Sequence, residues 1–276
     1  MFLPVILLMA APGPFIDVAH AQQLIAQKAI VLDARGDRAA APYIQGARVA
    51  EWTDIRDGWL RTGRLDGDQD RLRRYFEARG VQRGTPVIVY GAMADGWGEE
   101  GRIWWTLKYL GHPRVFIIDG GIQRWRQENG PITAQPAALL GQPTAFEVRK
   151  AARLRTDWRK LEAYRRSGAS IVDVRTRAEF DGGTPYWSSR GGHIPGAQWL
   201  YWKHLIRADG QLKSVDELRK LFRKAGIDQE RPVVTYCTGG VRSAFVVAAL
   251  TQAGIPAINY DGSWWDWSAR PLPVER

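Results

Sequence analysis

Short apolar runs alternate with longer amphipathic stretches along most of the chain. The runs PVIVY (86–90) and PVVTY (232–236) are rich in β-branched residues and lie among Gly and Pro, which predicts buried strands. The stretches 68–80 and 214–226 repeat apolar residues at helical spacing and each ends in glycine, which predicts helices with a glycine at C′. Strands that alternate with helices predict an α/β fold in which helices cover both faces of a parallel sheet.

This pattern occurs twice. The segment AIVLDAR in the first half of the chain resembles SIVDVR in the second half, and two longer segments repeat in the same way. The repeated segments, each with its later counterpart, are 29–35 with 170–175, 72–91 with 218–237, and 115–125 with 257–267. Because the order of the segments is kept, we interpret the chain as a duplication, that is, as two copies of one domain.

The repeat also gives the domain boundaries. Residues 14–131 are expected to form the first domain and residues 146–276 the second, with a linker rich in Pro, Ala and Gln at 132–145. Residues 1–13 contain an apolar run that is too short to span a bilayer but suits the core of a signal peptide. We therefore expect an exported, periplasmic protein. The alternative is an apolar N-terminal strand in a cytoplasmic protein.

Composition excludes several classes of function. The net charge is +10, but Lys and Arg are scattered among acidic residues and no nucleic-acid-binding motif is present. We therefore expect small anionic partners and no nucleic acid. A single cysteine rules out an internal disulfide, and the four histidines lack metal-ligand spacing. We expect a monomer with no metal, no cofactor and no stable membrane span.

The only cysteine follows the predicted strand of the second repeat. Cys237 begins the turn CTGGVR, which leads into an apolar helix predicted at 243–254. Ligands of parallel sheets bind beyond the carboxyl ends of the strands, and Gly239 and Gly240 let the backbone N–H groups point inward. These groups, the helix dipole and the nearby Arg242 favour an anion, so we expect a thiolate with a lowered pKa. The alternative is an inert buried cysteine.

The length of this turn separates two kinds of chemistry. Cysteine phosphatases use C-x5-R, whereas four residues separate Cys237 from Arg242 here. The smaller ring argues against a phosphatase or an arsenate reductase. It suits a persulfide, in which amides surround one extra sulfur on the cysteine. In this respect the turn resembles the active-site loop of the rhodanese (sulfurtransferase) family.

The resemblance extends over nearly the whole chain. The segments DVRTRAEFDGG (173–183) and GGHIPGA (191–197) look like a second motif of rhodanese domains, and residues 32–47 are a weaker copy of it. Tandem rhodaneses have an inactive first domain and a catalytic second domain. In agreement with this, Gly91 stands where the second copy has Cys237, so we expect the first domain to close the cleft.

The resemblance also implies the chemistry. Cys237 would attack the outer sulfur of thiosulfate, release sulfite and hold the sulfur as a persulfide, which cyanide or a thiol then removes. The loop amides would stabilise the sulfur anion, and Arg242 would neutralise the donor through paired hydrogen bonds. The expected donor-binding residues are Thr238, Gly239, Gly240, Val241, Arg242, Ser243 and Arg190, and the expected supporting residues are Asp173, Arg175 and His193.

Two alternatives to a thiosulfate sulfurtransferase stay open. Mercaptopyruvate transferases of this fold usually have a loop closer to C-G-S-G-[VI]-[TS], which lacks the arginine. The permanent cation of Arg242 favours a compact dianion, so thiosulfate is the preferred donor over 3-mercaptopyruvate. The other alternative is a persulfide carrier that delivers its sulfur to one protein partner.

Overall fold

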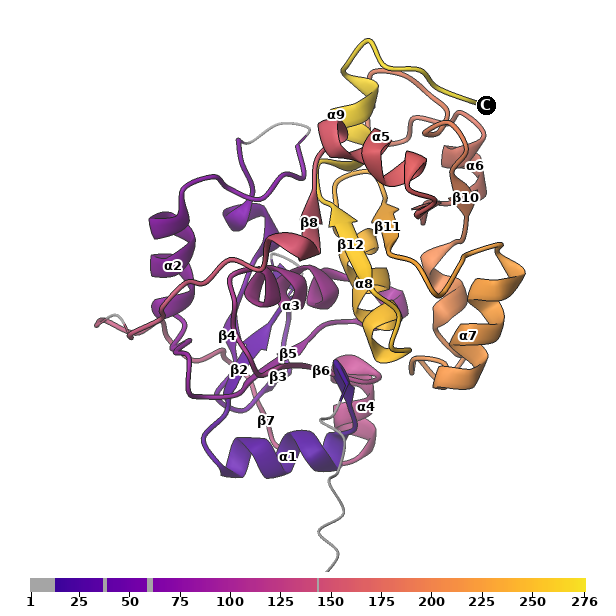
Figure 1. Ribbon diagram of the computed structural model, residues 1–276. Coiled ribbons are helices and arrows are strands. Elements are labelled where there is room, and N and C mark those ends of the chain that lie inside the picture. Colours follow the sequence, from indigo (N-terminus) through magenta and orange to yellow (C-terminus); the bar gives the residue numbers. More distant parts are fainter. Residues whose placement is uncertain (1–12, 37–38, 59–61, 143) are drawn as a thin grey trace, which may run out of the picture.

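The repeat folds into two parallel sheets with the same strand order (Figure 1). The computed structural model describes residues 13–36, 39–58, 62–142 and 144–276, so the signal-like segment lies outside the described residues apart from Gly13. The first sheet runs in the order β4 (Arg48–Val49), β2 (Ile30–Asp33), β5 (Val87–Tyr90), β6 (Val115–Ile118) and β1 (Phe15–Ile16). The second runs in the order β10 (Gln198–Trp199), β9 (Ser170–Asp173), β11 (Val233–Tyr236), β12 (Ala257–Tyr260) and β8 (Arg155–Thr156). The predicted duplication and α/β class are confirmed.

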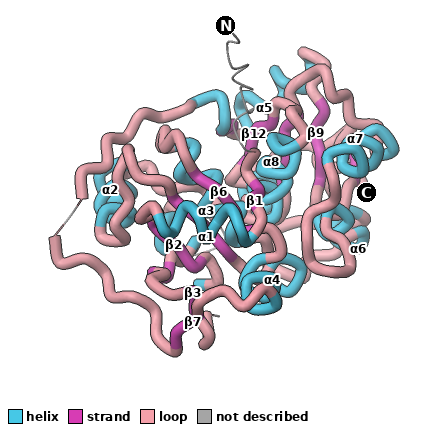
Figure 2. Tube along the Cα trace, turned by 90° about the horizontal axis from the view of Figure 1, so that it is seen from below, coloured by secondary structure: helices cyan, strands magenta, loops and turns pink. Residues whose placement is uncertain are grey.

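Helices flank both sheets (Figure 2). Those of the first domain are α1 (Val18–Ala26), α2 (Gln69–Glu77), α3 (Glu99–Tyr109) and α4 (Gly121–Gln127). Those of the second are α5 (Trp158–Arg166), α6 (Arg177–Phe180), α7 (Val215–Lys224), α8 (Arg242–Gln252) and α9 (Ser263–Ser268). The helices α2 and α7 confirm the two amphipathic predictions, and the glycines that follow them, Gly80 and Gly226, have φ of +86° and +76°. Within the described part of the chain, we find no helix with the length and apolarity needed to cross a membrane.

The segment between the domains is held against the first domain. Strand β7 (Ile132–Thr133) opens the expected linker and pairs antiparallel with β3 (Tyr43–Ile44). Further along, the backbone N–H of Leu140 donates to the carbonyl of Ala78 at 2.7 Å. This segment therefore connects the domains along the surface of the first one.

One hydrophobic core is shared by both domains. It lies where α3 packs against α8, in the middle of the molecule (Figures 1 and 2). The helices approach closely because position 101 is a glycine: a Cβ there would lie 2.3 Å from the Cα of Phe245. Phe245 itself is fully buried and packs edge-on against Phe15 and Trp202. This contact places the first turn of α3 beside the first turn of α8, where the cysteine loop ends.

Candidate active site

Cys237 lies where the sequence predicts it, directly after the central strand β11 and before α8. Its side chain is buried, and its Sγ accepts a hydrogen bond from the backbone N–H of Gly240 at 3.1 Å. The hydroxyl of Ser243 lies 3.7 Å from the same sulfur. Gly240 has a φ of +75°, a backbone conformation that glycine adopts without strain. The expected turn with inward-pointing N–H groups is present.

The start of α9 holds the other side of the loop. The carbonyl groups of Cys237 and Thr238 accept the backbone N–H groups of Trp264 and Trp265, both at 3.0 Å. The N–H of Cys237 donates to the hydroxyl of Ser263 at 3.1 Å. Because these carbonyls are used on the α9 side, the loop can present N–H groups to the sulfur.

The surroundings of Cys237 favour its anion. Burial by itself raises the pKa of the thiol. The charge of Arg242 and hydrogen bonds from Ser243 and from the backbone of Gly239 act in the opposite direction, and the net effect is a pKa below the ordinary value for cysteine. This supports a reactive thiolate over an inert buried cysteine.

The guanidinium of Arg242 is bound by Glu179 and Thr238. Its Nη1 and Nη2 each lie 2.8 Å from one carboxylate oxygen of Glu179, and Nη2 also donates to the hydroxyl of Thr238 at 2.6 Å. Burial would raise the pKa of Glu179, but Arg242 and Thr238 lower it to about 2, so the carboxylate is ionised. This bidentate ion pair braces the loop, and Arg242 also lines a pocket above the loop, so donor binding by Arg242 stays a prediction.

A small pocket opens above the loop, with a volume of about 170 Å³. Cys237, Thr238, Gly239, Val241 and Arg242 form its floor. Four aromatic side chains, here called the aromatic mouth, surround it: Trp52 and Trp97 from the first domain, and Tyr186 and Trp265 from the second. Both domains thus line the pocket, which agrees with the expectation that the first domain closes the cleft.

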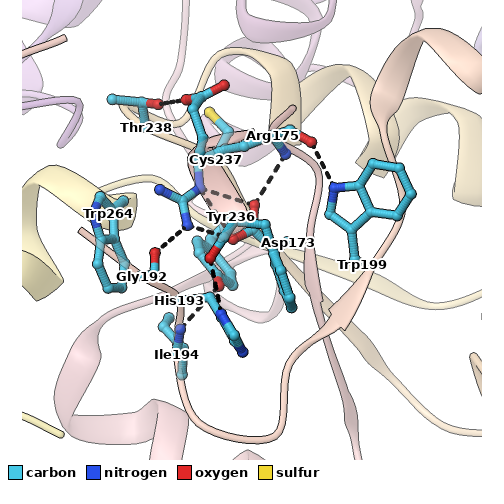
Figure 3. Close-up of polar contacts among 12 residues, drawn as sticks. Asp173, Arg175, Gly192, His193, Ile194, Trp199, Tyr236, Cys237, Thr238 and Trp264 are labelled. Atoms are coloured by element: carbon cyan, nitrogen blue, oxygen red, sulfur yellow. Dashed lines mark hydrogen bonds and ion pairs between the residues drawn. The ribbon is translucent and has the colours of Figure 1, made fainter. Parts of the chain in front are cut away.

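The three residues expected to support the site make polar contacts with one another and with neighbouring backbone (Figure 3). Arg175 and Asp173 form a buried ion pair of 2.6 Å, and Arg175 also donates to the carbonyl of Gly192 at 2.7 Å. The ring of His193 stacks on Phe180 at 3.6 Å between centroids, with its Nδ1 3.0 Å from the Phe180 carbonyl. All three therefore fix the turn of the GGHIPGA segment beside the loop.

Arg190 also has a different place from the one expected. Its guanidinium donates to the carbonyls of Ser268 and Leu272, both at 2.9 Å, and to those of Trp267 and Arg270. These carbonyls belong to the end of α9 and the segment after it, and Arg190 is not among the residues that line the pocket. We correct its role from donor binding to anchoring of the C-terminal segment.

Sequence reasoning missed Glu179, the aromatic mouth residues Trp52, Trp97 and Tyr186, and one buried arginine of the first domain, Arg102. Glu179 is part of a T-x-x-E capping box with Thr176, a pattern that is visible in the sequence. Arg102 donates to the carbonyl of Gly240 in the loop at 3.2 Å. No local pattern marks it, because its partner lies 138 residues further along the chain.

The duplicated α/β fold places Cys237, with its lowered thiol pKa, at the floor of a pocket lined by both domains, an arrangement that suits nucleophilic chemistry by a cysteine. The sequence model of the Rhodanese-like domain matches residues 17–128 and 157–270, and the chain belongs to this family. Its curated relatives include thiosulfate and 3-mercaptopyruvate sulfurtransferases, so sulfurtransferase function is supported for the family.

Individual relatives carry different names. The chain is 32% identical to the sulfur carrier protein TtuD of Thermus thermophilus over 82% of each chain. It is 31% identical to the thiosulfate sulfurtransferase of Gallus gallus, over 72% of this chain and 69% of the relative. It is 29% identical to the 3-mercaptopyruvate sulfurtransferase of Rattus norvegicus, over 72% and 68%.

Solved structures support the fold. The structure of SseA from Escherichia coli superposes with a TM-score of 0.79 at 24% identity, covering 91% of this chain and 99% of that one. The structure of YnjE gives a TM-score of 0.83 at 24% identity, covering 95% and 69%. The tandem rhodanese architecture inferred from the repeat is confirmed.

Proposed function

We propose that this protein is a thiosulfate sulfurtransferase that carries the transferred sulfur as a persulfide on Cys237. The observation that carries the proposal is the position of the Cys237 sulfur. It lies 3.1 Å from the Gly240 N–H at the floor of the pocket, and its surroundings lower the thiol pKa. A persulfide anion has the same charge as the thiolate, so the loop amides can stabilise either.

The reaction has two steps. The Cys237 thiolate attacks the outer sulfur of thiosulfate, a new S–S bond forms, and the old S–S bond breaks with its electron pair leaving on sulfite. Cyanide or a thiol then attacks the outer sulfur of the persulfide and regenerates the thiolate, which gives thiocyanate or a new persulfide. The covalent intermediate divides one difficult transfer into two easier ones.

The choice of thiosulfate rests on the small pocket and on curated relatives of that name at 29–31% identity. It no longer rests on Arg242, because Glu179 balances the charge of this residue. 3-Mercaptopyruvate would load the same persulfide and release pyruvate. Initial rates with the two donors, measured side by side with cyanide as acceptor, separate these activities.

A persulfide carrier is the second candidate. TtuD, a relative that this chain matches over 82% of its length, is named a sulfur carrier protein. The aromatic mouth also supports this candidate, because aromatic side chains are enriched where proteins bind one another. Slow discharge to cyanide and small thiols, together with fast discharge to a protein acceptor, would favour the carrier.

Mass spectrometry of the intact protein tests the persulfide directly. Thiosulfate should add the mass of one sulfur atom, and cyanide should remove it. Cys237 is the only cysteine in the chain, so no other thiol can accept the sulfur. Cys237→Ser should show no gain in mass; a gain in this variant, or none in the natural protein with either donor, would rule the proposal out.

We also propose that residues 1–13 direct export, as their apolar run favours. N-terminal sequencing of the protein recovered from its native cell tests this. A mature chain that begins after this segment is expected, and an intact Met1 in a cytoplasmic fraction would contradict it.

A further inference from the structure

The backbone of Gly240 is held by hydrogen bonds on both sides of its Cα. Its N–H donates to the Cys237 sulfur at 3.1 Å. Its carbonyl, at the other end of the same residue, accepts from the side-chain amide of Asn259 at 3.1 Å and from Nη1 of Arg102 at 3.2 Å. Side chains that hold this carbonyl therefore restrain the backbone of Gly240, the residue whose N–H meets the sulfur.

Arg102 belongs to the other domain. It lies in the first turn of α3, is fully buried, and reaches the loop because Gly101 lets α3 approach α8. Its Nη2 donates to the carbonyl of Gly63 at 2.6 Å, also in the first domain. The guanidinium thus joins a backbone segment of the first domain, here called the silent domain because it lacks a cysteine, to the cysteine loop of the second, here called the catalytic domain.

The charge of Arg102 has no counterion in contact. Within the described ranges no carboxylate forms an ion pair with it, and its Nε has no hydrogen-bond partner. The nearby Asp261 instead pairs with Arg155 at 3.0 Å and accepts the backbone N–H of Leu65 at 2.6 Å. Burial lowers the pKa of Arg102 to about 10, while the negative charges of Asp261 and of Cys237 act to raise it.

A buried cation is costly unless an anion compensates it. The attraction between Arg102 and an ionised Cys237 is mutual, so the guanidinium that gains from the thiolate also stabilises the thiolate. A structural link between the domains alone would not need this charge, since the apolar contact of Gly101 with Phe245 already joins them.

We propose that Arg102 is a positioning residue of the sulfur-transfer site: it restrains Gly240, whose N–H meets the Cys237 sulfur, and its buried charge stabilises the anion there. The silent domain is then an electrostatic part of the active site. The effect on the thiolate stands by itself, and the effect on the persulfide rests on the proposed function.

The test is the pH dependence of thiol alkylation by iodoacetamide in the full-length protein, since only the thiolate reacts. Arg102→Gln removes the charge and should raise the pKa of Cys237 by about one, which slows alkylation about tenfold at a pH below that pKa. Arg102→Lys keeps a positive charge on a more flexible chain and should slow alkylation by a smaller but measurable factor of about three. Near-ultraviolet circular dichroism identifies the variants that fold.

Arg79→Gln is the matched control. Arg79 is a buried arginine of the same domain that also donates to two backbone carbonyls, those of Val49 and Tyr75, at 2.7 and 2.8 Å. Arg79→Gln should leave the pH dependence of alkylation unchanged. If every Arg102 variant that folds has the natural profile, or if Arg79→Gln shifts the profile as much, the proposal is overturned. Arg102→Lys carries the test alone if Arg102→Gln does not fold.

Alkylation needs no sulfur donor, so this test and that of the proposed function can fail separately. A shifted thiol pKa in Arg102→Gln without any sulfur loading of the natural protein would support the role of Arg102 and reject the persulfide. Normal sulfur loading of the natural protein, together with an unshifted Cys237 pKa in Arg102→Gln, would support the persulfide and reject the role of Arg102.

Discussion

The two domains keep the same polar network at their strand ends, although only the second has a cysteine there. In the first domain the carboxylate of Asp33 accepts Nε and Nη2 of Arg35, at 3.0 and 2.7 Å. In the second, Asp173 accepts the same two nitrogens of Arg175, at 2.9 and 2.6 Å. In each domain the backbone N–H of the arginine also donates to the aspartate, at 2.9 and 3.0 Å.

A tyrosine completes each network. The hydroxyl of Tyr90 accepts the backbone N–H of Ile44 at 3.3 Å, and that of Tyr236 accepts the N–H of Ile194 at 3.0 Å. Because the first domain keeps all of these contacts without a thiol, they serve the folding of the strand ends. Sulfur chemistry therefore depends on what differs between the domains.

The difference is concentrated at the end of the central strand. Gly91 takes the place of Cys237, and a Cβ at position 91 would lie 2.0 Å from a carboxylate oxygen of Glu100. Counted back from the glycines that follow α3 and α8, Glu100 corresponds to Ser243, the hydroxyl neighbour of the Cys237 sulfur. The first domain thus has a buried acid where the second has room for a sulfur anion.

The largest expected effect is the loss of the nucleophile. Cys237→Ser should lower sulfur-transfer turnover on the order of 10⁴-fold or more, because removing the group that forms the covalent intermediate leaves only binding. Adding Gly91→Cys to this variant should not restore activity, since Glu100 occupies the space and disfavours a second anion. Turnover with thiosulfate and cyanide measures both, and activity regained by the double variant would contradict the comparison.

The shared network can be tested by matched substitutions. Asp33→Asn leaves the mostly buried Arg35, and Asp173→Asn the fully buried Arg175, without its counterion. Each should lower the free energy of unfolding by about 3–5 kcal/mol, with the larger loss for Asp173→Asn. Urea denaturation measures this, with Asp181→Asn, which removes an exposed partner of Arg177, as a control that changes little. Asp33→Asn should leave the activity of the folded protein intact. An equal loss of activity in both variants would show that the polar network of the first domain also affects catalysis.

The sequence could predict the features that are local or periodic. The strand, the Cys237 turn and the following helix lie next to one another in the chain, and the repeat shows which copy lacks the thiol. The partners of buried charges could not be predicted in this way. The chain has 29 acidic residues, and only the folded structure brings Glu179 rather than another of them to Arg242.

The same reason explains the missed contribution of the first domain. The contact of Arg102 with Gly240 exists only because the two copies pack α3 on α8. The preference for thiosulfate stays a prediction, and the sequence did not show that Glu179 pairs with the cation of Arg242 on which it was based. The aromatic mouth likewise collects residues from four separate segments.

Acid should weaken the catalytic domain through Glu179. Its pKa is lowered from 4.5 to about 2 in the folded protein, despite burial, by Arg242 and Thr238. This stabilisation is complete above about pH 4.5 and is lost as the pH falls toward 2, and it amounts to about 3 kcal/mol. Unfolding free energies between pH 2 and 6 should show this dependence. Glu179→Gln should lack it, whereas Glu162→Gln, which affects an exposed pair with Arg165, should retain it.

Glu100 should give the first domain the opposite pH dependence. Burial, followed by the nearby charge of Glu99, raises its pKa from 4.5 to about 8; backbone N–H groups of Glu100 and Met93 oppose this without reaching hydrogen-bond geometry. Between these two values the folded protein binds a proton that the unfolded chain releases. The free energy of unfolding should therefore fall as the pH rises from 4.5 to about 8, by about 1.4 kcal/mol per pH unit.

Glu100→Gln, which cannot ionise, removes this slope, and its advantage over the natural protein should grow from pH 6 to pH 8. Urea denaturation at several pH values measures it, with Glu128→Gln, at the half-exposed partner of Arg124, as the control. Parallel stability profiles for Glu100→Gln and the natural protein would mean that the silent domain accommodates a carboxylate at this position as readily as the catalytic domain accommodates its thiolate.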